Sequence, residues 1–432
     1  MSASRPADRP FLAETIAIGS ELLVGGRTDS NSLFLAEMLG QLGIEVRFKT
    51  VVGDDQVDIV RVLKAAVSRA GVVVITGGLG PTVDDCTREA IAKATGRRLA
   101  RRKEALDGMT ARLAEWGRTP NPAQMRQALI PSGATVLAKS VGSAPGFCLS
   151  WKNALLVSLP GVPREMEAMV LQEVVPLLKA RIAACAQCPS PIARHVFHTW
   201  GLPEADVDAR LKGVIPKGAP IDLGLLASPM GVLVSLTTKP SGKKRGTSDL
   251  LPGLAEQVRS RLSEWLFAEG HDTMEAVVGR LLAERKLTVA TAESCTGGLI
   301  GHRLTQVPGS SAYVDRGAIC YSNQSKIDML GVPADLIAKQ GAVSQAVAAA
   351  MAKGIRERAG VSVGLSVTGI AGPGGATETK PVGLVYIGLD GGPGEAITKE
   401  YRFHGDRQVI KQRSSQAALD LLRRWALNRS GA

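Results

Sequence analysis

The stretch Val72-Val-Val-Ile-Thr-Gly-Gly-Leu-Gly-Pro-Thr-Val-Asp-Asp-Cys-Thr87 combines a continuous apolar run, a glycine-containing turn and two acidic residues. The apolar run is typical of a buried strand, and a helix is expected from about Arg88. Glycines allow backbone N–H groups to approach an anion, and the start of a helix adds a positive dipole end. The stretch therefore predicts a strand–loop–helix unit whose loop binds a phosphate-bearing ligand.

The same alternation extends to both sides of this stretch, from Glu14 to about Leu178. Strand-like and helix-like segments alternate at residues 15–18, 31–42, 46–51, 57–70 and 72–76. This βαβ pattern predicts a largely parallel sheet with helices on both faces. In such sheets ligands bind beyond the carboxyl ends of the strands, where Gly19 and Thr76 lead into glycine-containing loops.

Two further parts follow along the chain. Short strands and one helical stretch between about Arg181 and Glu269 predict an α+β domain. Near Met274 a second α/β unit begins, with a strand at Leu287–Thr291, a glycine-rich turn and another helix. The expected fold class is α/β: two α/β modules with mainly parallel sheets, at residues 11–178 and 270–428, joined by a small α+β domain at residues 179–269.

The composition is that of a globular protein with its own hydrophobic cores. Of the 432 residues, 45% are hydrophobic and 21% are charged, which is an ordinary balance. Residues 1–10 lack the apolar core of a secretory signal, and the apolar runs are far shorter than the roughly 20 residues that cross a bilayer. Six scattered cysteines fit free thiols in a reducing compartment. We therefore expect a cytoplasmic protein that does not enter a membrane.

The net charge of +12 raises the question of a polyanionic partner. The basic residues are spread along the chain, and only Arg97–Lys103 and Lys243–Arg245 form short clusters. A solvated helix face and a charged loop account for such clusters. We therefore expect no specific nucleic-acid binding, and instead expect small-molecule ligands and a homo-oligomer.

A possible zinc set consists of Cys185-x2-Cys188 with His195 and His198. Residues 193–199 have the pattern of a strand, in which residues three apart face opposite sides of the sheet. Because the two histidines would then not converge on one ion, we interpret these residues as surface thiols and ordinary strand histidines.

Asp84 and Asp85 place two carboxylates directly after the glycine-containing loop. A divalent cation that bridges carboxylate and phosphate oxygens would explain their position. A glycine turn followed by an aspartate that caps a helix also explains it.

In the second α/β unit, the segment with the most candidate catalytic residues is Ala290-Thr-Ala-Glu-Ser-Cys-Thr-Gly-Gly-Leu299. It places Ser294 at a strand-to-helix turn, where a hydroxyl is exposed and N–H groups at the helix start can accept an oxyanion. Ser294 also fits a simple helix N-cap.

A serine nucleophile needs a base, and no histidine lies in a comparable loop. The segment Tyr321-Ser-Asn-Gln-Ser-Lys326 supplies a lysine, which accepts the serine proton when burial or nearby positive charge lowers its pKa. A glycine-rich loop suited to a phosphate follows at Thr368-Gly-Ile-Ala-Gly-Pro-Gly-Gly375. Gly405-Asp-Arg407 adds a guanidinium for a carboxylate or phosphate.

In combination these segments resemble the competence/damage-inducible CinA family, and the resemblance covers nearly the whole chain. The N-terminal part resembles the family's molybdopterin-binding-type domain, through the segments Ile18–Leu23, Asp29–Asn31, Gly77–Thr87, Asn121–Ala128, Gly142–Gly146 and Leu159–Met166. The C-terminal segments quoted above resemble its nicotinamide mononucleotide amidohydrolase domain.

For the N-terminal module the resemblance implies hydrolysis of the pyrophosphate of ADP-ribose or a related dinucleotide, assisted by a divalent metal ion. The implied positions are a site lined by Glu21, Asp29 and Asn31, phosphate held by Gly77, Gly78 and Gly80, and metal bound by Asp84 with Asp29. The sequence departs from many relatives at Gly25-Gly-Arg27 and at Ser30. Phosphate binding tolerates these departures better than catalysis does.

For the C-terminal module the resemblance implies conversion of nicotinamide mononucleotide into nicotinic acid mononucleotide and ammonia, without a cofactor. Ser294 would be the nucleophile, Lys326 the base, and Tyr321 and Thr368 supporting polar groups. The substrate would be bound by Gly297, Gly369, Gly372, Gly374, Gly375 and Arg407. Cys295 is a rival nucleophile. The alternative to an enzyme is a non-catalytic regulatory protein, linked to competence or DNA damage, that binds a nucleotide or pterin.

Overall fold

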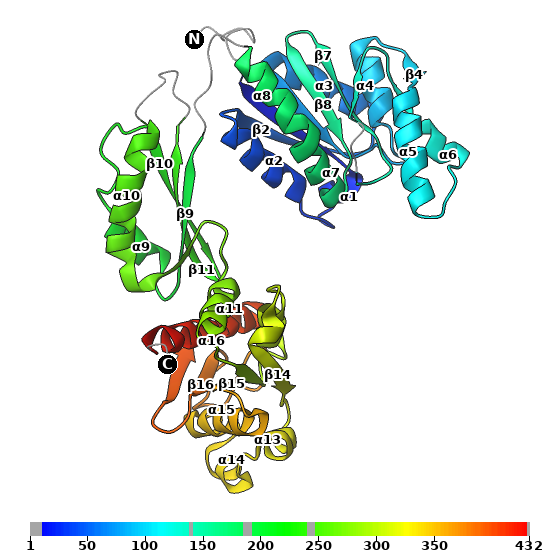
Figure 1. Cartoon of the computed structure of the whole chain (residues 1–432). Helices are drawn as coiled ribbons and strands as arrows, with labels where there is room; N and C mark the ends of the chain where they lie inside the picture. The colour runs from blue at the N-terminus through cyan, green and yellow to red at the C-terminus, as the bar shows by residue number, and fades with distance from the viewer. Residues whose placement is uncertain (1–10, 138–140, 185–191, 240–246, 430–432) are drawn as a thin grey trace. The chain divides into compact units, whose positions relative to one another are not determined.

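The computed structural model describes residues 11–137, 141–184, 192–239 and 247–429 (Figure 1). The chain divides into two compact units, one of residues 1–194 with 237–250 and the other of residues 195–236 with 251–432. A search of the described residues finds no helix that is long and apolar enough to cross a membrane.

A six-stranded sheet organises the N-terminal module, in the order β2-β1-β3-β8-β7-β6. Its strands are β1 (Leu12–Ile18), β2 (Glu45–Val52), β3 (Val72–Thr76), β6 (Thr135–Leu137), β7 (Gly146–Trp151) and β8 (Ala154–Leu159). The first four strands in this order are parallel, as the βαβ pattern predicted. Strand β7 is antiparallel to both of its neighbours, β8 and β6. The two residues between β7 and β8 allow a hairpin but no crossover.

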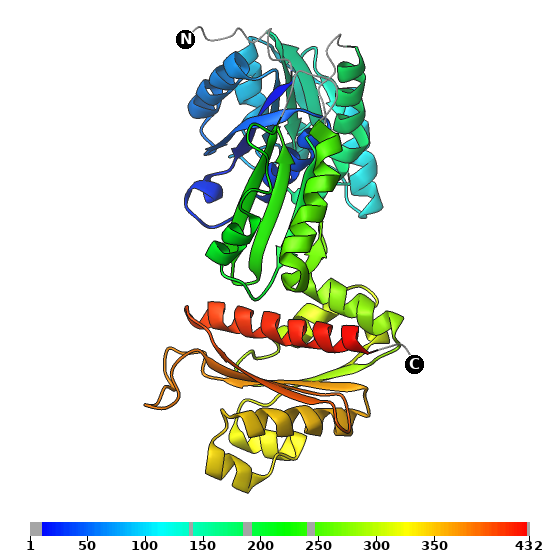
Figure 2. The same ribbon diagram turned by 90° about the vertical axis from the view of Figure 1, so that its left-hand side faces the viewer.

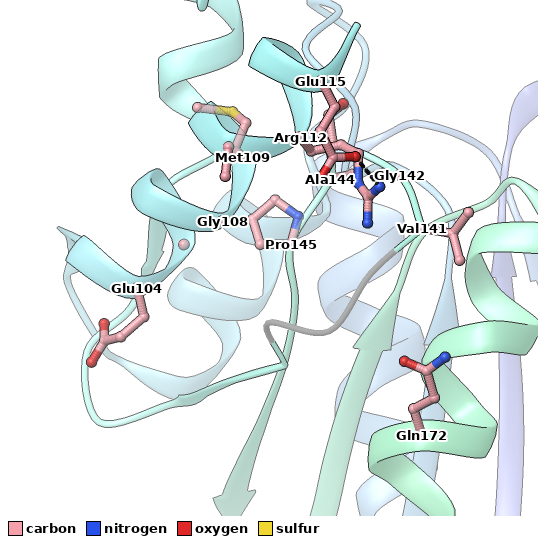
Figure 3. A pocket seen from close by; sticks show the side chains of 13 residues that line it. Glu104, Gly108, Met109, Arg112, Glu115, Val141, Gly142, Ala144, Pro145 and Gln172 are labelled. Carbon is pink, nitrogen blue, oxygen red and sulfur yellow. Dashed lines mark hydrogen bonds and ion pairs between the residues drawn. The ribbon is translucent and has the colours of Figure 1, made fainter.

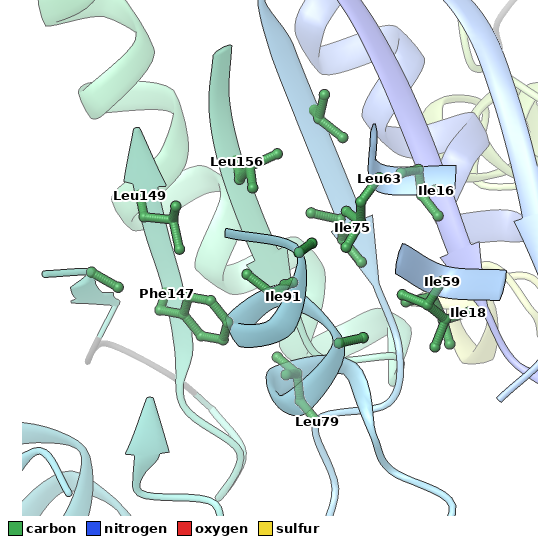
Figure 4. Packing of buried hydrophobic residues seen from close by; sticks show 14 of the residues in the cluster. Ile16, Ile18, Ile59, Leu63, Ile75, Leu79, Ile91, Phe147, Leu149 and Leu156 are labelled. Atoms are coloured by element: carbon green, nitrogen blue, oxygen red, sulfur yellow. The ribbon is translucent and has the colours of Figure 1, made fainter. Parts of the chain in front are cut away.

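Helices cover both faces of this sheet. On one face, Ile59 of α3 (Gln56–Arg69) and Ile91 of α4 (Thr87–Thr95) pack in the same buried cluster as Ile75 of β3 (Figure 4). The helices on the other face are α2 (Ser30–Gln41), α7 (Pro163–Met169) and α8 (Val175–Ala183), with the π-helical turn η2 (Val170–Val174) between the last two. Smaller elements complete the module: α1 (Ser20–Leu23), α5 (Lys103–Glu115), α6 (Pro122–Arg126) and the paired strands β4 (Leu99–Arg101) and β5 (Leu129–Pro131).

The direction of the strand order reverses between β1 and β3, which gives this sheet a topological switch point. The parallel strands end at Ile18, Val52, Thr76 and Leu159, so the loops that follow them meet at one edge of the sheet. Gly146 begins the antiparallel β7 at this same edge, because its neighbour Phe147 pairs with Ser158. The segment 142–146 therefore lies at the edge where a ligand is expected.

A four-stranded sheet forms the middle part of the chain, in the order β10-β11-β9-β12. Its strands are β9 (Arg194–Thr199), β10 (Ile221–Ser228), β11 (Gly231–Thr238) and β12 (Leu266–Glu269). The helices of this part are α9 (Glu204–Leu211) and α10 (Thr247–Leu262), followed by the 3-10 turn η3 (Ser263–Trp265). This arrangement is the α+β pattern that the short strands predicted.

The C-terminal module is built on a five-stranded sheet in the order β14-β13-β15-β16-β17. Its strands are β13 (Val289–Glu293), β14 (Val314–Ile319), β15 (Val363–Gly369), β16 (Leu384–Asp390) and β17 (Ala396–Arg402). Strands β14, β13 and β15 are parallel, and β16 and β17 extend the sheet in antiparallel fashion.

Two layers of helices enclose this sheet, and Figure 2 shows α16 on one face and α15 on the other. The first layer contains α11 (Met274–Glu284), α12 (Leu299–Thr305) and α16 (Arg407–Asn428), and the second contains α13 (Asn323–Leu330), α14 (Ala334–Gln340) and α15 (Gln345–Ala359). The short 3-10 turn η4 (Ser310–Ala312) precedes β14.

The strand before the serine differs in its limits from the predicted one. The apolar pattern predicted a strand at Leu287–Thr291, whereas β13 runs from Val289 to Glu293, and α12 begins at Leu299. The prediction ended too early because Glu293 is charged, yet Glu293 is buried and pairs in register with Val367. Ser294 therefore follows the strand directly.

Candidate active sites

Ser294 lies in a tight connection between β13 and α12. Its backbone N–H donates to Val367 O at 3.0 Å, so the residue is held against the neighbouring strand. Gly297 and Gly298 have φ angles of 62° and 93°, a left-handed conformation that favours glycine. These glycines turn the chain from strand to helix and leave the Ser294 side chain almost buried, with 8% of the residue exposed.

Glu293 caps the helix that follows the serine. Its carboxylate accepts the N–H groups of Gly298, Ile300 and Gly301 at 3.0, 3.1 and 2.8 Å. The prediction that the N–H groups at the start of this helix donate to an oxyanion is therefore wrong for these three groups. Sequence reasoning missed Glu293, although a carboxylate just before a glycine-rich helix start is a signal for such a cap.

Lys326 lies in α13 and reaches Ser294 through the interior of the module. Its Nζ atom is 3.1 Å from Ser294 Oγ, 2.8 Å from Cys320 O and 3.3 Å from Tyr321 O. Only 1% of the residue is exposed, and burial lowers the pKa of its ammonium. A neutral amine carries two N–H groups and one lone pair. In the structure Lys326 Nζ donates to Ser294 Oγ and to these carbonyls. Once the amine has lost one proton, its two N–H groups can stay on carbonyl oxygens while the lone pair accepts the serine proton.

Cys295 follows Ser294 but is poorly suited to act as a nucleophile. Its side chain packs in the core of the module among buried apolar residues, and burial raises the pKa of its thiol to about 12. Because the thiolate is the reactive form of cysteine, a thiol held protonated in the core is inert. This environment favours Ser294 over Cys295.

Tyr321 and Arg407 lie together at the surface beside these buried groups. Arg407 Nη2 donates to Tyr321 Oη at 2.8 Å, and Arg407 Nη1 donates to Gly372 O at 2.9 Å. Tyr321 is 59% exposed. The contacts join three segments that are far apart in sequence: the loop after β14, the glycine-rich loop after β15, and the start of α16.

The glycines of the loop after β15 are glycine for different structural reasons. A Cβ atom at Gly369 would lie 2.7–2.9 Å from atoms of Leu384 and Val385. Gly372 and Gly375 have φ angles of 79° and 89°. At Gly374 a Cβ atom would meet nothing within 4 Å. Neither packing nor a left-handed backbone requires glycine at 374, so the fold itself gives no reason for a glycine at this exposed position.

Thr368 does not lie free beside the serine. Its buried hydroxyl donates to Ala342 O at 2.8 Å, in the segment between α14 and α15. Ser366, two residues earlier on the same strand, donates in the same way to Ala348 O of α15. The structure therefore gives the Thr368 hydroxyl a role in holding the neighbouring segment, whereas the sequence predicted a supporting role near Ser294.

The N-terminal candidate site lies at the carboxyl edge of the six-stranded sheet. A Cβ atom at Gly77 would lie 2.2 Å from Ile18 O, and one at Gly161 would lie 3.3 Å from Gly77 Cα. Asn31 Nδ2 donates to Gly161 O at 2.8 Å, while Asn31 Oδ1 is buried without a partner among the described residues. The structure thus brings four predicted segments together, and the side chain at Asn31 retains an unused acceptor.

Side chains that the sequence did not single out donate hydrogen bonds to the carbonyl groups of the glycine-containing loop at 77–80. Arg88 donates to Leu79 O at 2.6 Å and to Gly80 O at 3.2 Å. Gln127 donates to Leu79 O at 3.0 Å, and Thr87 donates to Gly77 O at 2.9 Å. These hydrogen bonds fix the loop through its C=O groups. Gly78 has a φ of 63°, a left-handed conformation that favours glycine.

The acidic residues of this module have separate surroundings. Asp85 accepts from Thr82 N at 2.9 Å and from the Thr82 hydroxyl, so it fixes its own loop. Asp84 is exposed, and a hydrogen bond from Thr82 is the main cause that lowers its pKa. Asp29 caps α2 by accepting from Ser32 N, and Glu21 is exposed in α1. Neither aspartate at 84 or 85 caps α4, whose N-cap position is a cysteine.

No group of three or more His, Cys, Asp or Glu side chains is placed to hold a metal ion within the part of the chain that the structure describes. In the middle sheet, His195 Nε2 contacts the Glu269 carboxylate, and His198 Nε2 donates to Gly270 O. Cys185 and Cys188 lie outside the described residues.

A hollow of about 340 Å³ lies next to the N-terminal candidate site, between α5 and residues 141–145 (Figure 3). Arg112, Met109 and Gln172 are among the side chains that line it. Nearby, Glu165 is partly buried, and burial raises the pKa of its carboxyl group. A Cβ atom at Gly142 would overlap this carboxyl group. Glu165 is a further acidic group at this edge that the sequence did not single out.

Comparisons with known proteins match all three parts of the chain. Residues 14–180 match the "Probable molybdopterin binding domain", residues 194–268 the "Damage-inducible protein CinA KH domain" and residues 271–426 the "CinA C-terminal domain". A solved structure, the competence/damage inducible protein CihA from Agrobacterium tumefaciens, is 41% identical over 35% of this chain and 94% of its own, with a TM-score of 0.34.

Relatives of similar length match over almost the entire sequence. A "Putative competence-damage inducible protein" of Halothermothrix orenii is 41% identical over 96% of this chain and 98% of its own length. A "CinA-like protein" of Geobacter sulfurreducens is also 41% identical, over 96% of this chain and 98% of its own. With these matches, and with the three domain models in the same order, the chain belongs to the competence/damage-inducible CinA family.

Proposed function

We propose that the C-terminal module hydrolyses the carboxamide of nicotinamide mononucleotide to nicotinic acid mononucleotide and ammonia. The observation that carries the proposal is the 3.1 Å approach of Lys326 Nζ to Ser294 Oγ in a buried site. Among the described residues, the hydrogen-bond partners of this amine are Ser294 and three backbone carbonyls, and no carboxylate. A lysine in such a place is a suitable base for a serine.

The reaction proceeds in two halves, with Lys326 carrying one proton in each. In the first half, Ser294 Oγ bonds to the carboxamide carbon and its proton passes to Lys326 Nζ. The tetrahedral species then breaks its C–N bond, and Lys326 returns the proton to the departing nitrogen, which leaves as ammonia. In the second half, water attacks the acyl-serine and gives a proton to Lys326. The bond from carbon to Ser294 Oγ then breaks, and Ser294 regains its proton.

The surroundings of the pair suit a polar substrate. Arg407 donates hydrogen bonds to Tyr321 Oη and to Gly372 O of the glycine-rich loop after β15, and a Cβ atom at Gly374 in that loop would meet nothing within 4 Å. The guanidinium has further N–H groups that can donate to the substrate. Because Thr368 is engaged with Ala342 O, we assign it a positioning role for the loop after β15.

For the N-terminal module we propose metal-assisted hydrolysis of a pyrophosphate in ADP-ribose or a related dinucleotide. The support is a glycine loop at the switch point of a parallel sheet, with the exposed Asp84 beside it. Magnesium is usually bound by one or two carboxylates together with substrate phosphates rather than by a complete protein cage. In that mode Asp84, with Asp29, would hold the ion together with the substrate phosphates, and the bound ion would neutralise the phosphate charge.

Assays on the full chain test both activities. Ammonia release from nicotinamide mononucleotide tests the C-terminal reaction, and cleavage of ADP-ribose with added magnesium or with a chelator tests the N-terminal one. Absence of ammonia release from well-folded protein would reject the first proposal. Cleavage of ADP-ribose that the chelator does not affect would reject the role of the metal.

A further inference from the structure

Lys411 is a cation beside the serine turn that neither the sequence pattern nor the proposed reaction uses. It lies four residues after Arg407 in α16, and residues at this spacing share one face of a helix. Its Nζ atom is 3.6 Å from the position that a Cβ atom would take at Gly297. Gly297 is exposed, and its N–H donates to Ser294 O at 3.1 Å. Lys411 therefore faces the outer side of the turn that carries the nucleophile.

The Lys411 ammonium has no hydrogen bond or ion pair with any described residue. Arg407 differs, because its two terminal nitrogens already contact Gly372 O and Tyr321 Oη. Lys326 also differs, because it is enclosed by backbone carbonyls and Ser294. Of these three cations, Lys411 alone keeps its full donor capacity for a ligand.

Part of the backbone near Lys411 is already engaged. The N–H groups of Gly298, Ile300 and Gly301 all donate to the Glu293 carboxylate. These three N–H groups are therefore not free to bind a ligand anion. The absence of a side chain at Gly297 leaves the approach to the Lys411 ammonium open.

We propose that Lys411 binds the 5′-phosphate of the substrate and makes the site select a nucleoside monophosphate over the corresponding nucleoside. This inference rests on the proposed amidohydrolase function. With the carboxamide at Ser294, the ribose and phosphate extend along the outer side of the turn towards Gly297. A phosphate there meets an unpaired ammonium, and a charge-assisted hydrogen bond of this kind is stronger than one between neutral groups.

The test compares nicotinamide mononucleotide with nicotinamide riboside, which lacks the phosphate, on the full-length protein. Affinities are measured by calorimetry in a Ser294→Ala background, so that turnover does not interfere, and kcat and KM are measured with Ser294 present. The variants are Lys411→Met, which keeps the length of the side chain and removes the charge, and Lys411→Arg, which keeps the charge. Lys399→Met is the matched control, because Lys399 is exposed on β17, three strands away from β13.

We expect the unsubstituted site to prefer the nucleotide over the riboside by about tenfold or more, as one charge-assisted contact provides. Lys411→Met should remove most of this preference through KM, with kcat for the nucleotide much less affected. Lys411→Arg should restore most of the preference, and Lys399→Met should leave it unchanged.

Two results would overturn the inference while the proposed function stands. One is a Lys411→Met protein that releases ammonia and still prefers the nucleotide to the same degree. The other is a loss confined to kcat, which would place Lys411 at the reacting centre instead. Failure of the proposed function is separate, because the unsubstituted protein would then release no ammonia from the nucleotide at all.

Discussion

The two candidate sites of this chain differ in how completely the fold assembles them. In the C-terminal module the serine and lysine already lie 3.1 Å apart, both almost fully buried, on elements that the core fixes. In the N-terminal module the loop is equally well held, but its acidic side chains cap a helix, brace their own loop or extend into solvent. The serine–lysine pair is preassembled, whereas the acidic side chains of the N-terminal module are engaged separately from one another.

This difference follows from the chemistry that each site is proposed to perform. A general base must lie within hydrogen-bond reach of the proton that it removes, so the protein itself has to provide that geometry. A magnesium-assisted phosphate site receives part of its coordination from the substrate. The first site should therefore respond to loss of a single side chain far more strongly than the second.

The largest expected effect tests whether Ser294 and Lys326 act as one unit. Ser294→Ala, Lys326→Ala and the double variant should each lose deamidation by on the order of 10³-fold or more, because residues that share a proton-transfer step are strongly non-additive. Ammonia release measures the loss, and nucleotide affinity should largely persist. Lys339→Ala, at an exposed lysine of α14, is the control.

Two outcomes would break this part of the comparison. Near-normal turnover in Ser294→Ala would end the serine mechanism and redirect attention to Cys295. A double variant whose defect equals the product of the two single defects would show that the residues act independently.

A smaller loss is expected at the N-terminal site from Asp84→Ala. If Asp84 binds the metal, ADP-ribose cleavage should fall by at least about 10²-fold, while deamidation and the melting temperature stay the same because the side chain is exposed. Asp85→Ala should lower the melting temperature, since Asp85 braces the loop through Thr82. Asp58→Ala, on the surface of α3, is the control. Unchanged ADP-ribose hydrolysis in Asp84→Ala would remove this residue from the site.

The sequence predicted the features that depend on residues close together in the chain, such as individual strands, loops and motifs. The run Val72–Thr76 and its glycine turn formed the expected strand and loop, and the serine came directly after a strand. Lys326 was predicted as the partner of Ser294 from its motif, and the two lie within hydrogen-bond distance. Their roles in a reaction remain proposals.

The sequence did not predict contacts that depend on packing between distant segments. Arg88 and Gln127 reach the carbonyls of the 77–80 loop from separate elements, and Thr368 finds its acceptor 26 residues away. Glu293 has the polarity of a loop residue, yet it ends a buried strand because a helix start supplies three donors. Residue type alone cannot show that such donors are present.

The pH dependence of deamidation gives a more moderate test of the preassembled site. The base acts when neutral, so kcat should rise by about tenfold per pH unit below the pKa of Lys326 and level off above it. Burial lowers this pKa from the ordinary 10.5, and the plateau should therefore begin below that value. The Cys295 thiol titrates near 12 and does not contribute to this range. A kcat that falls as pH rises through this range would show that protonated Lys326 is required.

The smallest expected effect concerns Glu293, which supports the serine turn without touching the reacting atoms. Glu293→Gln keeps one acceptor oxygen and places an NH₂ group where Oε2 or Oε1 now accepts a backbone N–H. An unsatisfied buried donor costs about 1–3 kcal/mol, which in a unit of this size lowers the melting temperature by roughly 2–4 °C per kcal/mol. Because the Ser294 turn loosens, kcat should fall only severalfold while the position of the pH plateau stays fixed, since Lys326 is held by other contacts.

Glu284→Gln, at an exposed carboxylate at the end of α11, is the control and should change neither the melting temperature nor kcat. A shift of the pH plateau in Glu293→Gln would show that the carboxylate acts on the base electrostatically, and the preassembled site would then extend to a third residue.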